Sequence, residues 1–216
     1  MTIFDLVFIL VFLGTVAVLV SVLVTALRGF RMRALRRLLA LGSYLAVYLA
    51  IVVTVSLLSP RREFRIGQDE CFDDWCLAVE KAQFASTVGQ AATLRSTRGV
   101  FCIVTLRVSS RALGRAQAAP DAAVHLLDDR ERVYHPSPEA QQAYEASFGS
   151  TPPLGSRLQP GASFQSVRVF ELPADADNLG LVVDHGGWPG RFVIGDANSL
   201  LHKRTVILLP RPDRPS

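Results

Sequence analysis

Two uninterrupted runs of uncharged residues near the start of the chain constrain its fold more than any other feature. Residues 6–27 and 38–59 contain no Asp, Glu, Lys or Arg. As a helix, each run of about 22 residues reaches roughly 33 Å, enough to cross a hydrocarbon core of about 30 Å. A cleaved signal peptide would begin with basic residues and carry a shorter apolar run, whereas this chain begins Met-Thr-Ile-Phe-Asp. We therefore expect a transmembrane hairpin over residues 1–59, with helices at about 6–27 and 38–58.

The segment between the two runs predicts their orientation. Residues 28–37 include five arginines, and short loops rich in arginine face the cytoplasm. Arg61, Arg62 and Arg65 oppose this orientation only weakly, so the chain after residue 59 is expected to be extracytoplasmic, at a bacterial plasma membrane. Ten residues between two spans cannot present a groove-reading element to nucleic acid, so membrane lipids with anionic headgroups are the expected partners of these arginines.

Small residues recur every four positions along both expected helices. Gly42, Ala46 and Ala50 share one face of the second helix, where close backbone approach supports helix packing in lipid. The matching stripe of the first helix comprises Ala17, Ser21 and Thr25. These stripes predict that the two helices pack on each other; the alternative is a docking surface for another membrane subunit. No ionisable residue lies deep in either run, which argues against an ion path built from this chain alone.

The chain after residue 59 has an ordinary, balanced charge composition. Removing the five loop arginines and Asp5 from the totals of 23 basic and 19 acidic residues leaves eighteen of each sign. A net charge near zero gives no electrostatic steering of DNA or RNA, so no nucleic-acid partner is expected.

Short strand signals dominate the same region. Seven or eight short strands separated by turn signals favour a mainly β fold, an immunoglobulin-like β-sandwich over residues 76–209. Residues 60–75 are expected to form a linker, 138–148 a short helix, and the proline-rich residues 210–216 a disordered tail. The expected strands are residues 76–82, 100–108, 122–127, 132–135, 162–172, 178–184, 192–194 and 205–209.

Three of these strand motifs resemble a bacterial family of membrane-tethered or lipoprotein-type immunoglobulin-like domains of unknown function. They are the long strand at 100–109, the pair 124–129 and 132–134 around an acidic turn, and the Leu-x-Pro-Gly motif at 158–161 that leads to 167–173. The chain departs from the family pattern at Glu131, where a turn glycine is usual, and in the alanine-rich loop 110–120. The resemblance implies a β-sandwich and no catalytic residues.

The two cysteines Cys71 and Cys76 flank the acidic segment Phe-Asp-Asp-Trp and are the most distinctive local motif. In an oxidising compartment this spacing predicts a disulfide that fixes the start of the sandwich, with Trp75 packed over it. Redox-active pairs use a two-residue spacing at a helix start, which this motif lacks. Cys102 is expected as a buried thiol in a strand, and its pairing with Cys71 or Cys76 is the alternative.

The remaining polar motifs predict no cofactor and no metal site. The carboxylates of Asp69, Glu70, Asp73 and Asp74 lack the spacing of a calcium loop, so a solvated acidic loop near Arg61, Arg62 and Arg65 is expected. The four histidines, His125, His135, His185 and His202, show no zinc-ligand spacing.

A glycine-rich loop at residues 184–190 superficially resembles a lipase oxyanion loop. The chain contains no Gly-x-Ser-x-Gly pentapeptide, so a loop between strands is the favoured interpretation, with Trp188 as an exposed contact residue. An enzyme would need a site built from Asp184, His185 and an unrelated serine.

These patterns together predict a non-enzymatic, membrane-anchored interaction module of the bacterial cell envelope that binds an envelope protein. The alternative is an accessory subunit that docks to a membrane complex through its helices.

Overall fold

The computed structural model describes residues 3–89, 94–97, 99–186, 189–196 and 198–210, which form two compact units. The first unit combines residues 1–61 with 187–204, and the second combines 62–186 with 205–216. Trp188 and most of the predicted tail lie outside the described residues.

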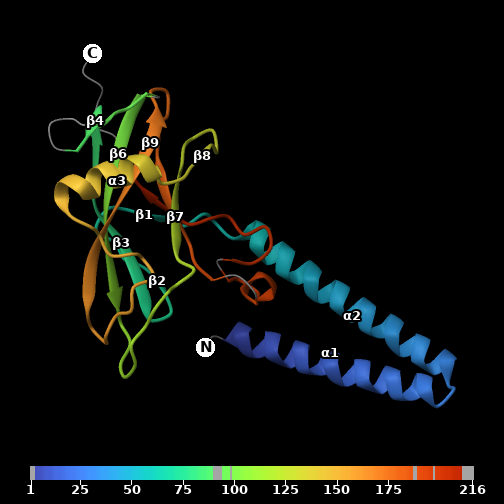
Figure 1. Cartoon of the computed structure of the whole chain (residues 1–216). Helices are drawn as coiled ribbons and strands as arrows, with labels where there is room; N and C mark the ends of the chain where they lie inside the picture. Colours follow the sequence, from blue (N-terminus) through green and yellow to red (C-terminus); the bar gives the residue numbers. More distant parts are fainter. Residues whose placement is uncertain (1–2, 90–93, 98, 187–188, 197, 211–216) are drawn as a thin grey trace. The chain divides into compact units, whose positions relative to one another are not determined.

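Two long helices make up most of the first unit. Helix α1 (Ile3–Leu27) and helix α2 (Arg31–Leu58) run antiparallel on either side of a tight turn (Figure 1). Gly29 occupies the left-handed region at the turn with φ 83°, where a side chain would be strained. The observed connection is therefore much shorter than the loop predicted at 28–37, and four of the five arginines predicted to lie in that loop belong to α2. Arginine is a good helix former, so the charges that end the apolar run do not end the helix.

The small-residue stripe of α2 does not face α1, whereas Ser21 and Thr25 of the α1 stripe accept hydrogen bonds from Arg37 of α2. Val11 of α1 and Leu41 of α2 are buried, whereas Gly42, Ala46 and Ala50 are exposed. A Cβ added at Gly42 would meet no atom within 4 Å. Gly42, Ala46 and Ala50 therefore do not mediate the packing of α2 on α1, and their role as a docking surface for another helix stays a prediction.

A segment distant in sequence packs on the second half of α2. The 3₁₀ helix η2 (Gly190–Phe192) lies in this segment, where a strand at 192–194 was predicted. The hydroxyl of Tyr48 donates to the carbonyl oxygen of Phe192 (2.7 Å), and the Ser56 and Ser199 hydroxyls lie 2.7 Å apart. Residues 187–204 thus belong with the helices and not, as predicted, with the sandwich.

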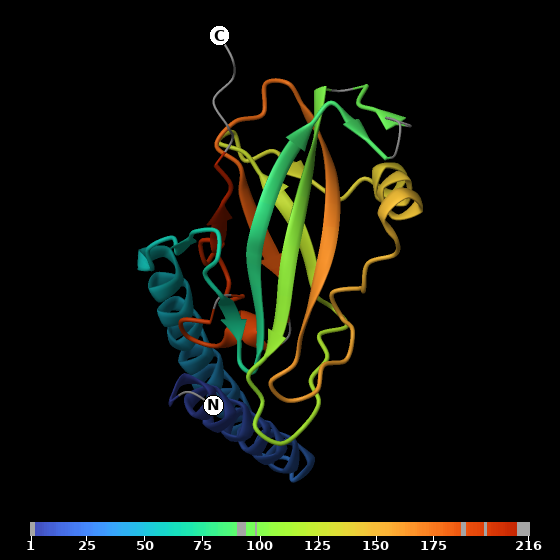
Figure 2. The ribbon, with the colours of Figure 1, turned by 90° about the vertical axis from the view of Figure 1, so that its left-hand side faces the viewer.

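The second unit is a two-sheet β-sandwich, as the strand pattern predicts. One sheet has the order β1-β11-β10-β7-β8 and is antiparallel except for the parallel pair β1 and β11, while the other has the order β2-β3-β6-β9 (Figure 2). The first sheet comprises β1 (Glu63–Phe64), β11 (Val206–Leu208), β10 (Gly180–Asp184), β7 (Ala123–Leu127) and β8 (Val133–Tyr134). The second comprises β2 (Glu70–Phe72), β3 (Trp75–Ala85), β6 (Gly99–Ser110) and β9 (Ser163–Pro173). A short extra pair, β4 (Thr87–Val88) and β5 (Leu94–Arg95), was not predicted.

The longest strand, β6, shows how the core is built. Its even positions from Cys102 to Val108 face the main core between the sheets, with Leu106 fully buried. At one end its odd positions are covered as well, because Phe101 packs against helix α3 (Pro138–Phe148) through Ala140. This second cluster explains why the alternation of the strand is lost at Phe101.

Helix α3 begins at a clear start signal and lies at the β9 edge of the sheet (Figure 2). The Ser137 hydroxyl accepts a hydrogen bond from the Ala140 amide, and Pro138 occupies the first turn. A serine cap followed by proline is a typical helix start, and the observed bounds are those of the short helix expected at 138–148.

The predicted linker at 60–75 is instead part of the sandwich. Strand β1 adds to one sheet and β2 to the other, and β2 pairs with β3 as a tight hairpin. Cys71 and Cys76 lie directly opposite each other in that hairpin and form a disulfide. Two- and three-residue strands carry too little alternation to be recognised in sequence.

Candidate functional site

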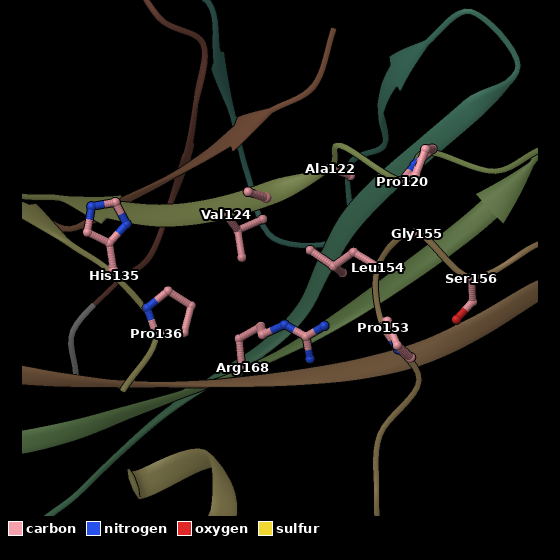
Figure 3. A pocket seen from close by; sticks show the side chains of 11 residues that line it. Pro120, Ala122, Val124, His135, Pro136, Pro153, Leu154, Gly155, Ser156 and Arg168 are labelled. Carbon is pink, nitrogen blue, oxygen red and sulfur yellow. The ribbon is translucent and has the colours of Figure 1, made fainter. Parts of the chain in front are cut away.

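A pocket opens at the lateral edge of the sandwich, between β9 of one sheet and β7 and β8 of the other (Figure 3). We call it the edge pocket; it has a volume of about 580 Å³. Most of its walls are apolar, with one arginine and one histidine among the polar groups. Its lining residues are Pro120, Ala122, Ala123, Val124, His135, Pro136, Pro153, Leu154, Gly155, Ser156 and Arg168.

Arg168 is the central charged group of the edge pocket. It lies in β9 on the same face as Phe170, which is fully buried in the main core. Because alternate residues of a strand face the same side, this register directs an arginine toward the space between the sheets. Figure 3 shows its guanidinium among Val124, Pro153 and Leu154.

The charge of Arg168 is only weakly compensated. Its one hydrogen bond among the described residues goes from Nη1 to the carbonyl oxygen of Val167 (2.7 Å), and no described carboxylate lies within 4 Å of it. Burial lowers the pKa of Arg168, and the more distant Glu145 carboxylate opposes this shift. The guanidinium stays charged near neutral pH, since an arginine starts from a pKa above 12. A half-buried cation in an apolar pocket favours an anionic ligand.

The nearest acidic group is already occupied. Glu145 Oε1 accepts hydrogen bonds from Gln141 Nε2 (2.7 Å) and Thr151 Oγ1 (3.2 Å). These bonds lower the pKa of Glu145, with the Gln141 bond as the largest cause. The carboxylate therefore stays ionised and is anchored to its own helix and to the loop after it, and it forms no ion pair with Arg168.

The backbone edge of β9 next to the pocket is closed by a glutamine side chain. Gln141 donates from Nε2 to the Val167 carbonyl oxygen (3.1 Å) and accepts at Oε1 from the Val169 amide (3.1 Å). The amide group thus occupies the hydrogen-bonding positions that a neighbouring strand would use. Protection of this kind disfavours the addition of a partner strand at this edge.

One glycine shapes the loop on the opposite side of the pocket. A Cβ at Gly155 would lie 2.8 Å from Pro120 Cα and 2.9 Å from the Ala119 carbonyl oxygen. Only glycine permits this close approach of two loops, which brings Leu154 and Ser156 to the pocket wall.

A buried aspartate fixes the β7–β8 hairpin, after which His135 enters the pocket. Asp128 accepts hydrogen bonds from Arg132 Nε (2.6 Å) and the Tyr134 hydroxyl (2.9 Å). Burial raises the pKa of Asp128, but the hydrogen bonds from Arg132, Tyr134 and the Arg130 amide together lower it below its usual value. Glu131 at the tip has a positive φ of 58°, a backbone conformation that favours glycine.

The acidic segment 69–74 is not the solvated loop that was predicted. Asp69 accepts hydrogen bonds from Arg107 Nη2 (3.0 Å) and Arg111 Nη2 (2.8 Å), so its partners are not the arginines at 61–65. Glu70 is only 6% exposed, and its Oε2 has no hydrogen-bond partner among the described residues. Burial raises the pKa of Glu70 to about 7, against a smaller opposing effect of Arg62.

The histidines take separate partners. His125 Nδ1 lies 2.7 Å from Asp184 Oδ2, and His185 Nδ1 lies 3.0 Å from Asp121 Oδ1. Asp184 and His185 thus pair with His125 and Asp121 and not with each other. His185 also contacts Trp75, with ring centroids 5.3 Å apart. In the described part of the chain, no three His, Cys, Asp or Glu side chains are placed to hold a metal ion.

Two of the three cysteines form a bond, and the third is in the core. The Cys71–Cys76 disulfide spans a Cα separation of 4.0 Å, and Trp75 beside it is 3% exposed and contacts Phe72 at a centroid distance of 5.8 Å. Cys102 is fully buried on β6 and is not part of this disulfide.

No family model matches the chain, and no curated protein matches it. The crystal structure of a conserved hypothetical protein from Bacillus anthracis is similar with 17% identity and a TM-score of 0.47, over 56% of this chain and 89% of that one. The secreted protein MPT63 of Mycobacterium tuberculosis shows 11% identity and a TM-score of 0.42 over 59% and 92%. An uncharacterized β-sandwich protein from Clostridium difficile 630 shows 8% identity and a TM-score of 0.40 over 70% and 96%. At these values the neighbours assign neither family nor function.

The sequence motifs did not identify Arg168 as a site residue. The strand 162–172 contains apolar residues on both faces around it, so alternation alone does not say which way Arg168 points. An arginine within Val-Arg-Val-Phe was the available signal, because a charged residue inside an otherwise apolar strand requires a polar partner or a pocket.

Proposed function

We propose that this protein is a membrane-anchored, extracytoplasmic β-sandwich that binds an anionic segment of an envelope protein, without catalysing a reaction. One observation supports the membrane anchor in particular. Apolar side chains are exposed along the whole of α1, for example Leu10 (61% exposed) and Leu23 (59% exposed). Helices of 25 and 28 residues with this surface match the length and the lipid-facing chemistry of membrane spans. In water the same surface would drive aggregation.

The orientation in this proposal rests on charge and on the disulfide. Five arginines gather at the turn of the hairpin, where the positive-inside rule favours the cytoplasm. A disulfide in the sandwich suits the oxidising side of a bacterial membrane. The immunoglobulin-like classification and the family resemblance rest on the strand motifs and belong to the same proposal.

The binding role rests on the edge pocket. Arg168 offers a charge without an ion-pair partner among the described residues, framed by apolar walls that would hold the stem of an acidic side chain or a chain terminus. A carboxylate matches the planar donor fork of arginine, which makes an acidic peptide segment the preferred ligand class.

A second function is favoured by the exposed stripe of α2. Gly42, Ala46 and Ala50 face away from α1, so they are available to a helix of another membrane protein. In this alternative the chain is an accessory subunit, and the hairpin is its docking element.

Topology is tested by thiol labelling of the full chain in intact cells. With Cys102 replaced by Ser, a membrane-impermeant maleimide should label Cys71 and Cys76 only after an impermeant reductant is added from outside. Cysteine introduced at Arg31 in a Cys71→Ser, Cys76→Ser, Cys102→Ser background should react only after the membrane is opened. Labelling of position 31 from outside would overturn the proposed orientation.

The binding role is tested by photocrosslinking in the same membranes. A photoreactive residue at Ser156, on the pocket wall, should capture a defined protein. Arg168→Gln should abolish the adduct, whereas Arg157→Gln, an exposed arginine outside the pocket lining, should preserve it. Capture that survives Arg168→Gln but disappears with Ala46→Leu would favour the accessory-subunit alternative instead.

A further inference from the structure

A second cavity lies within the helical unit, beside the turn between α1 and α2. It has a volume of about 460 Å³ and combines three arginines with two hydroxyl groups and an apolar wall. We call it the arginine notch. Its lining residues are Ala17, Val20, Ser21, Val24, Thr25, Arg28, Phe30, Arg33 and Arg37.

Arg37 is held in place across the hairpin. Its Nη1 donates to Ser21 Oγ (2.6 Å) and to Thr25 Oγ1 (2.7 Å), both on α1. The Thr25 hydroxyl in turn donates to the Ser21 carbonyl oxygen (2.6 Å), so its orientation is fixed as well. Ser21 and Thr25 are thus not merely small residues, because their hydroxyls fix the position of a guanidinium that lines the notch.

The other two arginines line the same notch. The guanidinium of Arg33 lies over the Phe30 ring at 4.9 Å from its centroid, and Arg28 directly follows the end of α1, in the hairpin bend. None of the residues that line the notch is acidic. Three converging positive charges without an acidic neighbour in the lining form an anion site rather than an ion-pair network.

The notch is also amphipathic along the helix axis. Ala17, Val20 and Val24 form its apolar wall toward the middle of α1, while the arginines lie toward the turn. Ser21 is six residues before the end of α1, which is about 9 Å along the helix axis. In the proposed anchor this places the arginines at the depth of the headgroup region and the apolar wall in the hydrocarbon core.

We propose that the arginine notch binds the phosphate of an anionic phospholipid of the cytoplasmic leaflet, with an acyl chain against its apolar wall. This inference rests on the proposed membrane anchor. Guanidinium groups bind phosphate oxygens through paired hydrogen bonds, and the hydroxyls of Ser21 and Thr25 keep Arg37 ordered before the lipid arrives. Free inorganic phosphate has the same charged group but no chain, so the test separates the two sources.

The test uses the purified full chain in neutral detergent and measures bound phosphatidylglycerol by native mass spectrometry. Arg37→Gln should weaken phosphatidylglycerol binding at least tenfold. Arg36→Gln removes the same charge from the next position of the same helix, but Arg36 does not line the notch, so its effect should stay below twofold. An equal loss of phosphatidylglycerol binding in the two variants would show a diffuse charge effect. It would overturn the assignment of the notch as the lipid site.

A second variant tests the positioning role of the hydroxyls. Ser21→Ala combined with Thr25→Ala keeps all five arginines and should still reduce binding severalfold, because Arg37 loses its supports on α1. Retained helicity by circular dichroism excludes unfolding as the cause. Full binding by this variant would contradict the preorganised site.

Two further readouts distinguish the ligand and the anchor. Inorganic phosphate should bind far more weakly than the lipid; phosphate binding that is sensitive to Arg37→Gln, with no retention of phosphatidylglycerol, would overturn the lipid assignment. Alkaline carbonate should leave every variant in the membrane fraction. Extraction of the wild-type chain from the membrane by carbonate would contradict the proposed membrane anchor, whatever the lipid-binding measurements in detergent show.

Discussion

The hairpin and the sandwich use the same apolar residues in opposite ways. Leu126 and Leu181 in the sandwich are fully buried between two sheets, whereas Leu13 and Leu23 in α1 are 57% and 59% exposed. The sandwich excludes water from its leucines through tertiary contacts. The hairpin leaves its leucines outside, where only an apolar solvent such as the lipid bilayer accommodates them. An apolar residue in the sequence therefore predicts that its side chain is shielded from water, but it does not predict whether protein or lipid shields it.

The largest contrast is expected from one substitution made in both regions. Leu126→Ala removes a fully buried side chain from the core and should lower the free energy of unfolding of the sandwich by about 3 kcal/mol. Leu23→Ala, at 59% exposure, should change it by less than about 0.5 kcal/mol. Urea unfolding of the full chain in detergent, followed by the fluorescence of the buried Trp75, measures both. A comparable loss of unfolding free energy for Leu23→Ala would mean that Leu23 is packed like a residue of a soluble core. That result would contradict the proposed difference between the hairpin and the sandwich.

A somewhat smaller change in the free energy of unfolding is expected from pH. It tests how completely the sandwich excludes water from its interior. Burial raises the pKa of Glu70 from 4.5 in the unfolded chain to about 7, so the folded state holds its proton more tightly. The resulting stability is present below pH 4.5 and is lost as the pH rises through 7, at a cost of roughly 2 to 3 kcal/mol. Urea midpoints at about pH 5 and about pH 8 should therefore differ.

Glu70→Gln should remove most of this pH dependence and make the sandwich more stable at the higher pH. Glu63→Gln, on an exposed position of β1, is the matched control and should leave the pH dependence in place. If Glu70→Gln leaves the two midpoints as far apart as in the wild type, the buried carboxyl is not the group responsible.

The smallest effect concerns the turns of the two regions. The hairpin turn already has glycine at its left-handed position, Gly29 with φ 83°, whereas the β7–β8 turn has Glu131 with φ 58°. Glu131→Gly should relieve a strain of about 1 kcal/mol, and the greater freedom of glycine in the unfolded chain should offset part of it. We expect a net stabilisation of about 0.5 kcal/mol in the same urea measurement. Glu131→Ala removes the same side chain without relieving the strain, so a gain of equal size there would contradict the backbone explanation.

Strong periodic signals predicted the elements well, and weak or ambiguous ones did not. Helix α3 was expected at 138–148 and has these bounds, and Ser137 and Pro138 form a local start signal for it that needs no tertiary partner. The segment 187–204 was assigned to the sandwich because a short apolar run looks the same in a strand and in a packed loop. Its bonds to Tyr48 and Ser56, more than 100 positions away, leave no trace in its own pattern.

The candidate site was the part least accessible from sequence. Arg168 lines the edge pocket only because β9 pairs with β6 in one register and Pro136 bridges to Phe170 beside it. A shift of one residue would turn Arg168 outward and bring Val167 or Val169 inward, with a composition that looks equally reasonable.

The amino-acid sequence by itself determined the division of this protein into an apolar helical pair and a β-sandwich, because hydrophobic run length and alternation are local properties of the chain. Only the tertiary structure decided which residues line the edge pocket and the arginine notch and which face of α2 remains exposed. It also decided that the carboxyl group of Glu70 is buried. Each of these depends on strand register, helix rotation or the approach of distant segments. Those are set by the packing of many side chains at once, and no short stretch of sequence contains them.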